Sequence, residues 1–140
     1  MKVLIIILVL FSLSSAKKYK NYGNATVSRV IYVYDGDTFR CDLLNMSPIV
    51  GENVGIRIKG IDTPEMRDKR PHIKAKAVEA RDYVRERLAA AEKIELVGMQ
   101  RGKYFRIVAT ILVDGANLSK ELIEKGLALP YDGGKKAKWE

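Results

Sequence analysis

Acidic side chains follow an apolar run in the segment GIRIKGIDTPE, which covers residues 55–65. Asp62 and Glu65 stand on either side of Pro64, although a turn requires only one Asp and one Pro. Two carboxylates three residues apart, around a proline that fixes the backbone, predict an oxygen-rich pocket. Carboxylate and carbonyl oxygens are the ligands that Ca²⁺ and Mg²⁺ prefer, so a hard cation is the expected occupant.

Related residue types recur in two further motifs. Asp35 and Asp37 lie in YDGDTF, Arg106 lies in KYFR, and Arg57 belongs to the first segment. Guanidinium groups bind phosphate oxygens at two points and stay charged at any working pH, which suits the charge that grows on a phosphodiester as it is cleaved. Because the chain has one His and one Cys, a zinc or copper site is not expected. A hard cation, a carboxylate base and two guanidiniums form a set that cleaves phosphodiesters.

The elements that must position these residues begin with strands. Residues Phe39, Cys41 and Leu43 alternate along one face of a strand, so Cys41 is expected to pack in the core. Runs rich in β-branched and aromatic residues predict five strands, which span residues 25–34, 37–44, 54–61, 93–98 and 104–115. Asp35-Gly36 predicts a tight turn between the first two strands.

Two helices are expected between and after these strands. A short helix over 117–125 is expected to end at Gly126, which can adopt a left-handed conformation. The resulting order predicts an α+β, mainly β, fold: a five-stranded OB-type Greek-key barrel with a helix inserted after strand 3 and a short helix after strand 5. The face of the inserted helix is predicted by apolar residues at steps of three and four, namely Ile73, Ala77, Ala80, Val84, Leu88 and Ala91.

The first sixteen residues have the layout of a signal peptide. Lys2 precedes the apolar run Val3–Leu13, and Ser14 and Ala16 occupy the small cleavage positions. That run of eleven residues is shorter than the roughly 20 that a helix needs to span a bilayer. We therefore expect cleavage near Ala16 and a secreted or periplasmic protein with no stable membrane span.

Length and composition favour one folded unit. A chain of 140 residues with 47% hydrophobic residues can bury a single core. The predicted organisation is a signal peptide over residues 1–16, a basic lead-in over 17–24 and one OB-fold domain over 25–140. The formal net charge of +8 falls only to +7 if Lys2 is lost with the signal peptide. Such a charge attracts a polyanion, whether nucleic acid, anionic lipid or cell-wall polymer.

The motifs YDGDTF, IRIKGIDTPE and KYFR, in this order and with a helix between the second and third, resemble the staphylococcal nuclease (thermonuclease) family. The resemblance runs from about Ala25 to Leu129. It implies an OB barrel with the two helices in the places given above. It also implies that Asp37 and Asp62 hold Ca²⁺ through their carboxylates, with the backbone carbonyl of Thr63 as a third ligand.

The resemblance implies roles for the other polar residues as well. Asp35 would lie nearby and help to orient the turn and the hydrated metal. Glu65 would position or deprotonate the attacking water, while Arg57 and Arg106 would bind the scissile phosphate from opposite sides. Tyr104 would either stack on a base or pack against the protein.

These roles predict an exported, Ca²⁺-dependent nuclease that hydrolyses DNA and RNA with little base specificity and acts as a monomer. In the family the products carry 3′-phosphate ends. One alternative is a non-catalytic OB module that binds single-stranded nucleic acid, and another is a basic adhesin for anionic lipid or wall polymer. The carboxylates discriminate between these functions, because a binding module needs the basic surface alone.

Several single residues have simpler interpretations. Arg57 shares a strand face with Lys59 and could be a solvated strand residue. His72 follows a proline in a basic loop and is expected to face solvent. Phe105 stands where the family usually has Gly before its second arginine, so the backbone there is expected to differ. Trp139 is expected to anchor the C-terminus against the barrel.

Overall fold

The computed structural model describes residues 19–140, and its main feature is a set of five long strands. The predicted signal peptide lies outside the described residues. The five strands are β1 (Ala25–Val33), β2 (Thr38–Leu43), β3 (Val54–Ile58), β5 (Ile94–Arg101) and β6 (Ile107–Val113). Short pairs of residues form β4 (Ile61–Asp62), β7 (Ala116–Asn117) and β8 (Leu129–Pro130).

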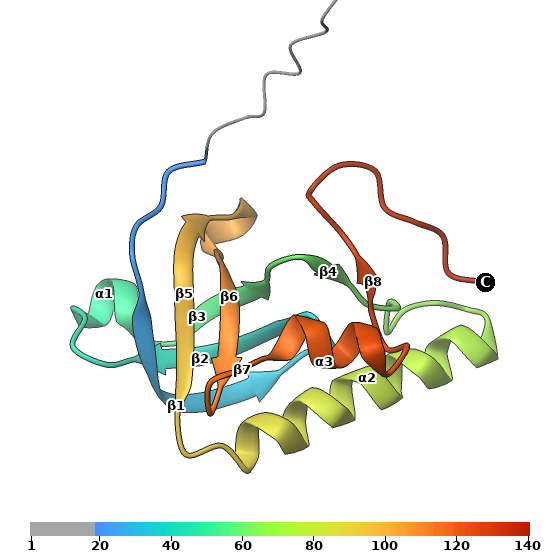
Figure 1. Ribbon diagram of the computed structural model, residues 1–140, viewed down its shortest axis with the longest axis horizontal. Helices are drawn as coiled ribbons and strands as arrows, with labels where there is room; N and C mark the ends of the chain where they lie inside the picture. Colours follow the sequence, from blue (N-terminus) through green and yellow to red (C-terminus); the bar gives the residue numbers. More distant parts are fainter. Residues whose placement is uncertain (1–18) are drawn as a thin grey trace, which may run out of the picture.

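The five long strands close into a barrel. Antiparallel pairing joins them in the order β3-β2-β1-β5-β6, and parallel pairing of β3 with β6 closes the ring (Figure 1). This arrangement confirms the predicted five-stranded OB-type barrel. The parallel pair matters for the site, because it sets the start of β6 beside the start of β3, with Ile56 opposite Ile107.

Alternating residues of the strands fill the barrel. Phe39 and Cys41 of β2 are fully buried, which confirms the packing role predicted for the thiol. Ile56 and Ile58 of β3 are also fully buried, so Arg57 between them projects from the other face of the strand.

Helices cover one end of the barrel. Helix α2 (Pro71–Ala89) buries Ile73, Ala77, Ala80, Val84 and Leu88, as its periodicity predicts, and His72 is exposed at its start. Helix α3 (Leu118–Glu124) lies beside α2 (Figure 1), where its Glu121 accepts hydrogen bonds from the Tyr83 hydroxyl and the Arg87 guanidinium. Across residues 19–140, none of the helices combines the length and apolar composition needed to cross a bilayer.

Local turns make several elements differ from the sequence prediction. The predicted strand over 104–115 begins only at Ile107, because residues 103–105 form a 3₁₀ turn in which Tyr104 and Phe105 have φ of 57° and 60°. Left-handed residues cannot continue a strand. Strand β3 stops at Ile58 and β4 follows after a turn at Gly60, and a short helix, α1 (Pro48–Gly51), lies in the loop after β2.

Candidate active site

The turn between β1 and β2 carries the first two aspartates. Both carboxylates are buried, and the Asp37 N–H donates to Oδ1 of Asp35 over 3.0 Å. Gly36 lies between them, and a Cβ at that position would stand 2.7 Å from Cγ2 of Thr63 and 2.8 Å from Cβ of Ala80. Only glycine therefore lets this turn approach both the Asp-Thr-Pro-Glu segment and helix α2 so closely.

A single hydrogen bond joins this turn to the Asp-Thr-Pro-Glu segment. The Thr63 N–H donates to Oδ2 of Asp37 over 3.0 Å, although the two residues are 26 positions apart. Asp62, Thr63 and Pro64 are all buried, and the Oγ1 of Thr63 has no hydrogen-bond partner. The proline restricts Thr63 to an extended backbone, which holds its N–H toward Asp37. Two acidic segments thus meet at one buried place.

Arg57 lies between the two segments. Its Nη2 is 3.4 Å from Oδ2 of Asp37 and 3.9 Å from Oδ1 of Asp62. The same guanidinium donates to the backbone carbonyls of Ile58 and Ile61 over 2.7 and 2.8 Å. With a side chain only 13% exposed, Arg57 is not a solvated strand residue, and that alternative is wrong. The bonds to two carbonyls fix the guanidinium before any ligand arrives.

The buried position of Asp35 perturbs its acidity. Burial, and then the negative charge of Asp37, raise its pKa from 3.8 to about 7. The Asp37 N–H that it accepts acts in the opposite direction and lowers the pKa. Buried carboxylates that repel one another are typical of places that bind a cation or move a proton.

Glu65 stands at the exposed edge of the cluster, where a lysine from the C-terminus reaches it. The Nζ of Lys136 is 3.5 Å from Oε1 of Glu65 and 2.9 Å from Oδ1 of Asp62. The nearby Asp62 carboxylate raises the pKa of Lys136. Lys136 could not be predicted from the sequence, because nothing in KKAKWE distinguishes it from Lys135 or Lys138.

Arg106 lies directly before β6, the strand that pairs with β3. Its Cγ is 3.1 Å from the point where a Cβ of residue 55 would stand, so its side chain crosses Gly55 on the face of β3 that also carries Arg57. Its Nε donates to the Lys103 carbonyl over 3.4 Å, and its guanidinium lies 5.9 Å from the Tyr104 ring. In the described part of the chain, no ion pair joins Arg106 to the aspartates.

The turn before Arg106 presents two aromatic rings to solvent. Tyr104 is 88% exposed and Phe105 is 98% exposed, so neither ring packs into the core. Lys103 precedes them, so the turn combines aromatic and positively charged side chains. Exposed rings beside cations are the usual surface on which unpaired bases stack.

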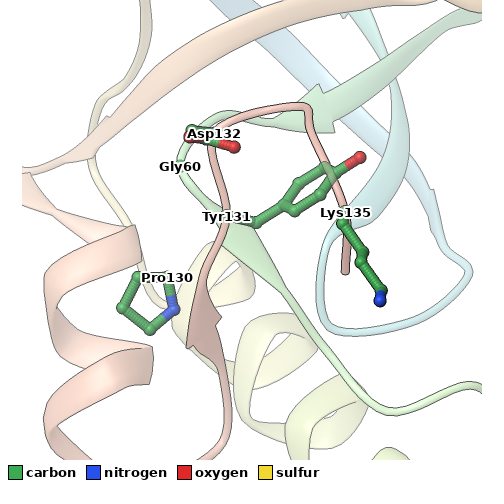
Figure 2. A pocket seen from close by; sticks show the side chains of 5 residues that line it. All are labelled: Gly60, Pro130, Tyr131, Asp132 and Lys135. Carbon is green, nitrogen blue, oxygen red and sulfur yellow. The ribbon is translucent and has the colours of Figure 1, made fainter. Parts of the chain in front are cut away.

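A pocket lies beside the acidic cluster. It encloses about 400 Å³ and is lined by Gly60, Pro130, Tyr131, Asp132 and Lys135. Figure 2 shows the Tyr131 ring at the centre of these residues. The same ring lies 5.9 Å from the Arg57 guanidinium, so the pocket and the cluster share a wall.

The residues at the cluster fit a hard cation. The carboxylates of Asp37 and Asp62 would supply oxygen ligands, and the Lys136 ammonium 2.9 Å from Asp62 marks a position that already accepts positive charge. Within residues 19–140, no three His, Cys, Asp or Glu side chains are arranged as a metal site by themselves. Any metal site here must therefore draw further oxygens from the backbone or from water.

Comparison with known proteins agrees with this geometry. The sequence model described as staphylococcal nuclease homologue matches residues 55–139, which is more than half of the chain. The chain belongs to the staphylococcal nuclease family. The predicted resemblance is confirmed. The matched segment includes Arg57, Asp62, Glu65 and Arg106, whereas Asp35 and Asp37 precede it.

A curated relative is named endonuclease YncB and comes from Bacillus subtilis (strain 168). It is 30% identical over 116 residues, which cover 81% of this chain and 50% of the relative. The chain thus spans about half the length of this curated relative. Membership of the nuclease family and an endonuclease among its relatives support a nuclease hydrolase.

Proposed function

We propose that this chain is an exported, Ca²⁺-dependent nuclease that hydrolyses phosphodiester bonds of DNA and RNA. The observation that carries the proposal is the junction of two acidic segments at one guanidinium: Thr63 bonds to Asp37, and Arg57 lies within 4 Å of both Asp37 and Asp62. Burying carboxylates costs free energy that only ion pairs and hydrogen bonds offset, and such buried charged groups cluster at functional sites.

The proposed metal ligands are the carboxylates of Asp37 and Asp62 and the backbone carbonyl of Thr63, with water completing the shell. When bound, Ca²⁺ supplies positive charge that polarises the phosphate. Asp35 supports the turn from which Asp37 projects, through the bond that it accepts from the Asp37 N–H. These residues therefore bind and orient, and the proton transfer falls to another group.

Glu65 is the proposed base, because it is the carboxylate at the exposed edge of the cluster, where water and substrate can arrive. It would accept a proton from the attacking water at a carboxylate oxygen. A carboxylate is a weak base for water, so other groups must offset the charge that grows on the phosphate. We propose that Arg57, already fixed by two carbonyls, and Arg106, directly before β6, do so.

The proposed substrate is any strand that brings a phosphate to this edge. Arginines and a cation recognise phosphate rather than base edges, so little base specificity is expected. The exposed rings of Tyr104 and Phe105 would hold bases by stacking, which tolerates every base. We further propose that the protein acts as a monomer in a secreted or periplasmic location.

The exposed aromatic turn also favours a second candidate, a non-catalytic module that binds single strands. Such a module does not require two buried aspartates beside Arg57. An adhesin for anionic polymers requires neither these aspartates nor the exposed aromatic turn. We therefore retain the binding module as the alternative that the experiment must exclude.

Residues 17–140 should be incubated with plasmid and with single-stranded DNA, in Ca²⁺, in Mg²⁺ and with a chelator. The proposal predicts cleavage in Ca²⁺ that the chelator abolishes. Glu65→Gln should lower the rate on the order of 10²-fold, whereas Glu79→Gln, at an exposed position of α2, should not. Binding without strand loss in Ca²⁺ would instead establish the binding module.

A further inference from the structure

The ammonium group of Lys136 lies beside Asp62, a proposed metal ligand, at a position where the metal ion would bind. It lies 2.9 Å from Oδ1 of Asp62 and 3.5 Å from Oε1 of Glu65. We propose that Lys136 is a positioning residue of this site, a tethered cation that holds Asp62 and Glu65 in the metal-free protein and gives up Asp62 when a divalent ion binds. This inference rests on the proposed function.

The contact differs from an ordinary surface ion pair. The Asp62 side chain is only 6% exposed, although half of the Lys136 side chain remains in contact with solvent. Exposed pairs contribute little because water screens both charges, but a buried carboxylate that loses its partner cannot recover the lost hydration. Asp62 would keep only the Arg57 guanidinium at 3.9 Å. Lys136 therefore stabilises the buried Asp62 carboxylate when no metal ion is bound.

The backbone before Lys136 is fixed to the site itself. Strand β8 pairs with β4, so that Asp62 lies opposite Leu129. Directly after β8, the Tyr131 N–H donates to the Gly60 carbonyl over 2.9 Å. The Tyr131 ring then lies 5.9 Å from both the Arg57 guanidinium and the Lys136 ammonium. Strand β8 is thus paired with β4, which carries the proposed ligand Asp62. The C-terminal tail, residues 131–140, follows β8 directly.

The end of the tail is fixed as well, at the start of helix α2. The Arg70 guanidinium donates to the Trp139 carbonyl over 2.7 Å, and the Lys76 ammonium lies 5.5 Å from the Trp139 ring. These contacts correct the prediction that Trp139 packs against the barrel. With attachments on both sides, Lys136 stays close to Asp62 at a high effective concentration.

A lysine and a metal ion cannot both occupy this position. Calcium binds carboxylate oxygens at about 2.3–2.6 Å, so an ion on Oδ1 of Asp62 would overlap the ammonium that now lies 2.9 Å away. Metal binding at this oxygen must therefore break the pair between Lys136 and Asp62. The freed ammonium would remain near Glu65, to which it is already linked. Lys136 should accordingly weaken metal binding while it stabilises the metal-free protein.

Lys136→Met keeps the apolar stem of the side chain and removes the charge. Calorimetric titration with Ca²⁺ alone, without nucleic acid, should give a Kd roughly ten-fold lower than that of the parent, because no ion pair has to be broken. In chelator the same variant should melt at a lower temperature than the parent. Lys136→Arg should restore the parent's melting temperature in chelator.

Lys138→Met is the matched control, since Lys138 is an exposed lysine of the same tail. It should change neither the Kd nor the melting temperature. A Kd for Lys136→Met within two-fold of the parent's would overturn the role of Lys136. If the parent nevertheless cleaves DNA in Ca²⁺, the proposed function stands without that role. If the parent neither binds Ca²⁺ nor cleaves DNA, the proposed function fails. The proposed displacement of Lys136 from Asp62 by a metal ion then fails with it.

Discussion

At the scale of single residues, the site depends on charges that are held in place before a ligand arrives. Arg57 donates to two backbone carbonyls and also lies beside two aspartates, so its guanidinium has little freedom left to lose. Arg106 is held less firmly, by the Lys103 carbonyl and by its passage over Gly55. The two arginines therefore have different geometries, and substitutions should affect them differently.

Arg106→Lys should lower the rate of DNA cleavage by about 10²-fold, because an ammonium cannot contact two phosphate oxygens as a guanidinium does. Initial rates on a labelled oligonucleotide in Ca²⁺ give the measurement. Arg101→Lys, at an exposed position on β5, is the control and should keep the parent's rate. If Arg106→Lys cleaves DNA as fast as the parent, Arg106 has no part in the reaction.

Asp35→Asn should change how stability depends on pH. The folded protein retains the Asp35 proton up to about pH 7, because burial and Asp37 raise its pKa, whereas an unfolded chain releases that proton near pH 4. The contribution of Asp35 to stability is therefore complete below pH 4 and is lost as pH rises through 7. An amide cannot ionise, so in chelator the variant should gain stability relative to the parent between about pH 5 and pH 8.

Urea denaturation of Asp35→Asn and of the parent, each at about pH 5 and at about pH 8, gives the measurement. Glu79→Gln, which removes an exposed carboxylate, should show no such gain. An equal difference between Asp35→Asn and the parent at both pH values would mean that Asp35 ionises normally in the folded protein.

Sequence reasoning found these residues because their types are unusual at strand ends. The carboxylates of YDGDTF and DTPE have no packing role, so they could be predicted as ligands without coordinates. Lys136 could not be found in this way. Its neighbours in KKAKWE carry the same charge, and only the pairing of β8 with β4 brings this lysine to Asp62.

At the scale of elements, turns decide where the polar groups point. Most strands and the buried face of α2 follow from their hydrophobic periodicity, and Asn117 and Gly126 bound α3 as expected. The turn at 103–105 does not follow from periodicity. Aromatic residues favour strands, but Tyr104 and Phe105 adopt left-handed backbone conformations instead. That conformation costs roughly 1–2 kcal/mol per residue, and Phe105 gains no burial in return.

Phe105→Gly should therefore raise the free energy of unfolding by about 1 kcal/mol, because glycine adopts a positive φ without the steric cost. Urea denaturation in chelator would measure the change. Phe105→Ala removes the same ring but keeps a Cβ, so it should bring no comparable gain. Equal stability of the Gly and Ala variants would show that the backbone at residue 105 is not strained.

At the scale of the whole molecule, a closed barrel holds the two acidic segments together. Parallel pairing of β3 with β6 completes the ring (Figure 1). The site lies at the turn between β1 and β2 and at β4, which is not one of the five long strands. The order of strands and helices predicted this fold, but the route of the tail from β8 back toward α2 depends on tertiary contacts of Tyr131 and Trp139.

Cys41 offers a test of that closed core. It is fully buried, and burial, followed by the charge of Asp42, raises the pKa of its thiol from 9.0 to about 12. A thiol reagent at pH 8 should therefore not label the folded protein, and labelling should begin only with global unfolding in urea. Fast labelling in the absence of urea would mean that β2 is accessible and the barrel opens locally.

The most direct test of the account is a crystal structure grown in Ca²⁺, with the ion located by its anomalous scattering. We predict one ion about 2.3–2.6 Å from a carboxylate oxygen of Asp37 and one of Asp62, with the Lys136 ammonium displaced from Asp62. A structure at saturating Ca²⁺ with no ion between these aspartates, and with Lys136 still paired to Asp62, would contradict the metal site and the nuclease mechanism built on it.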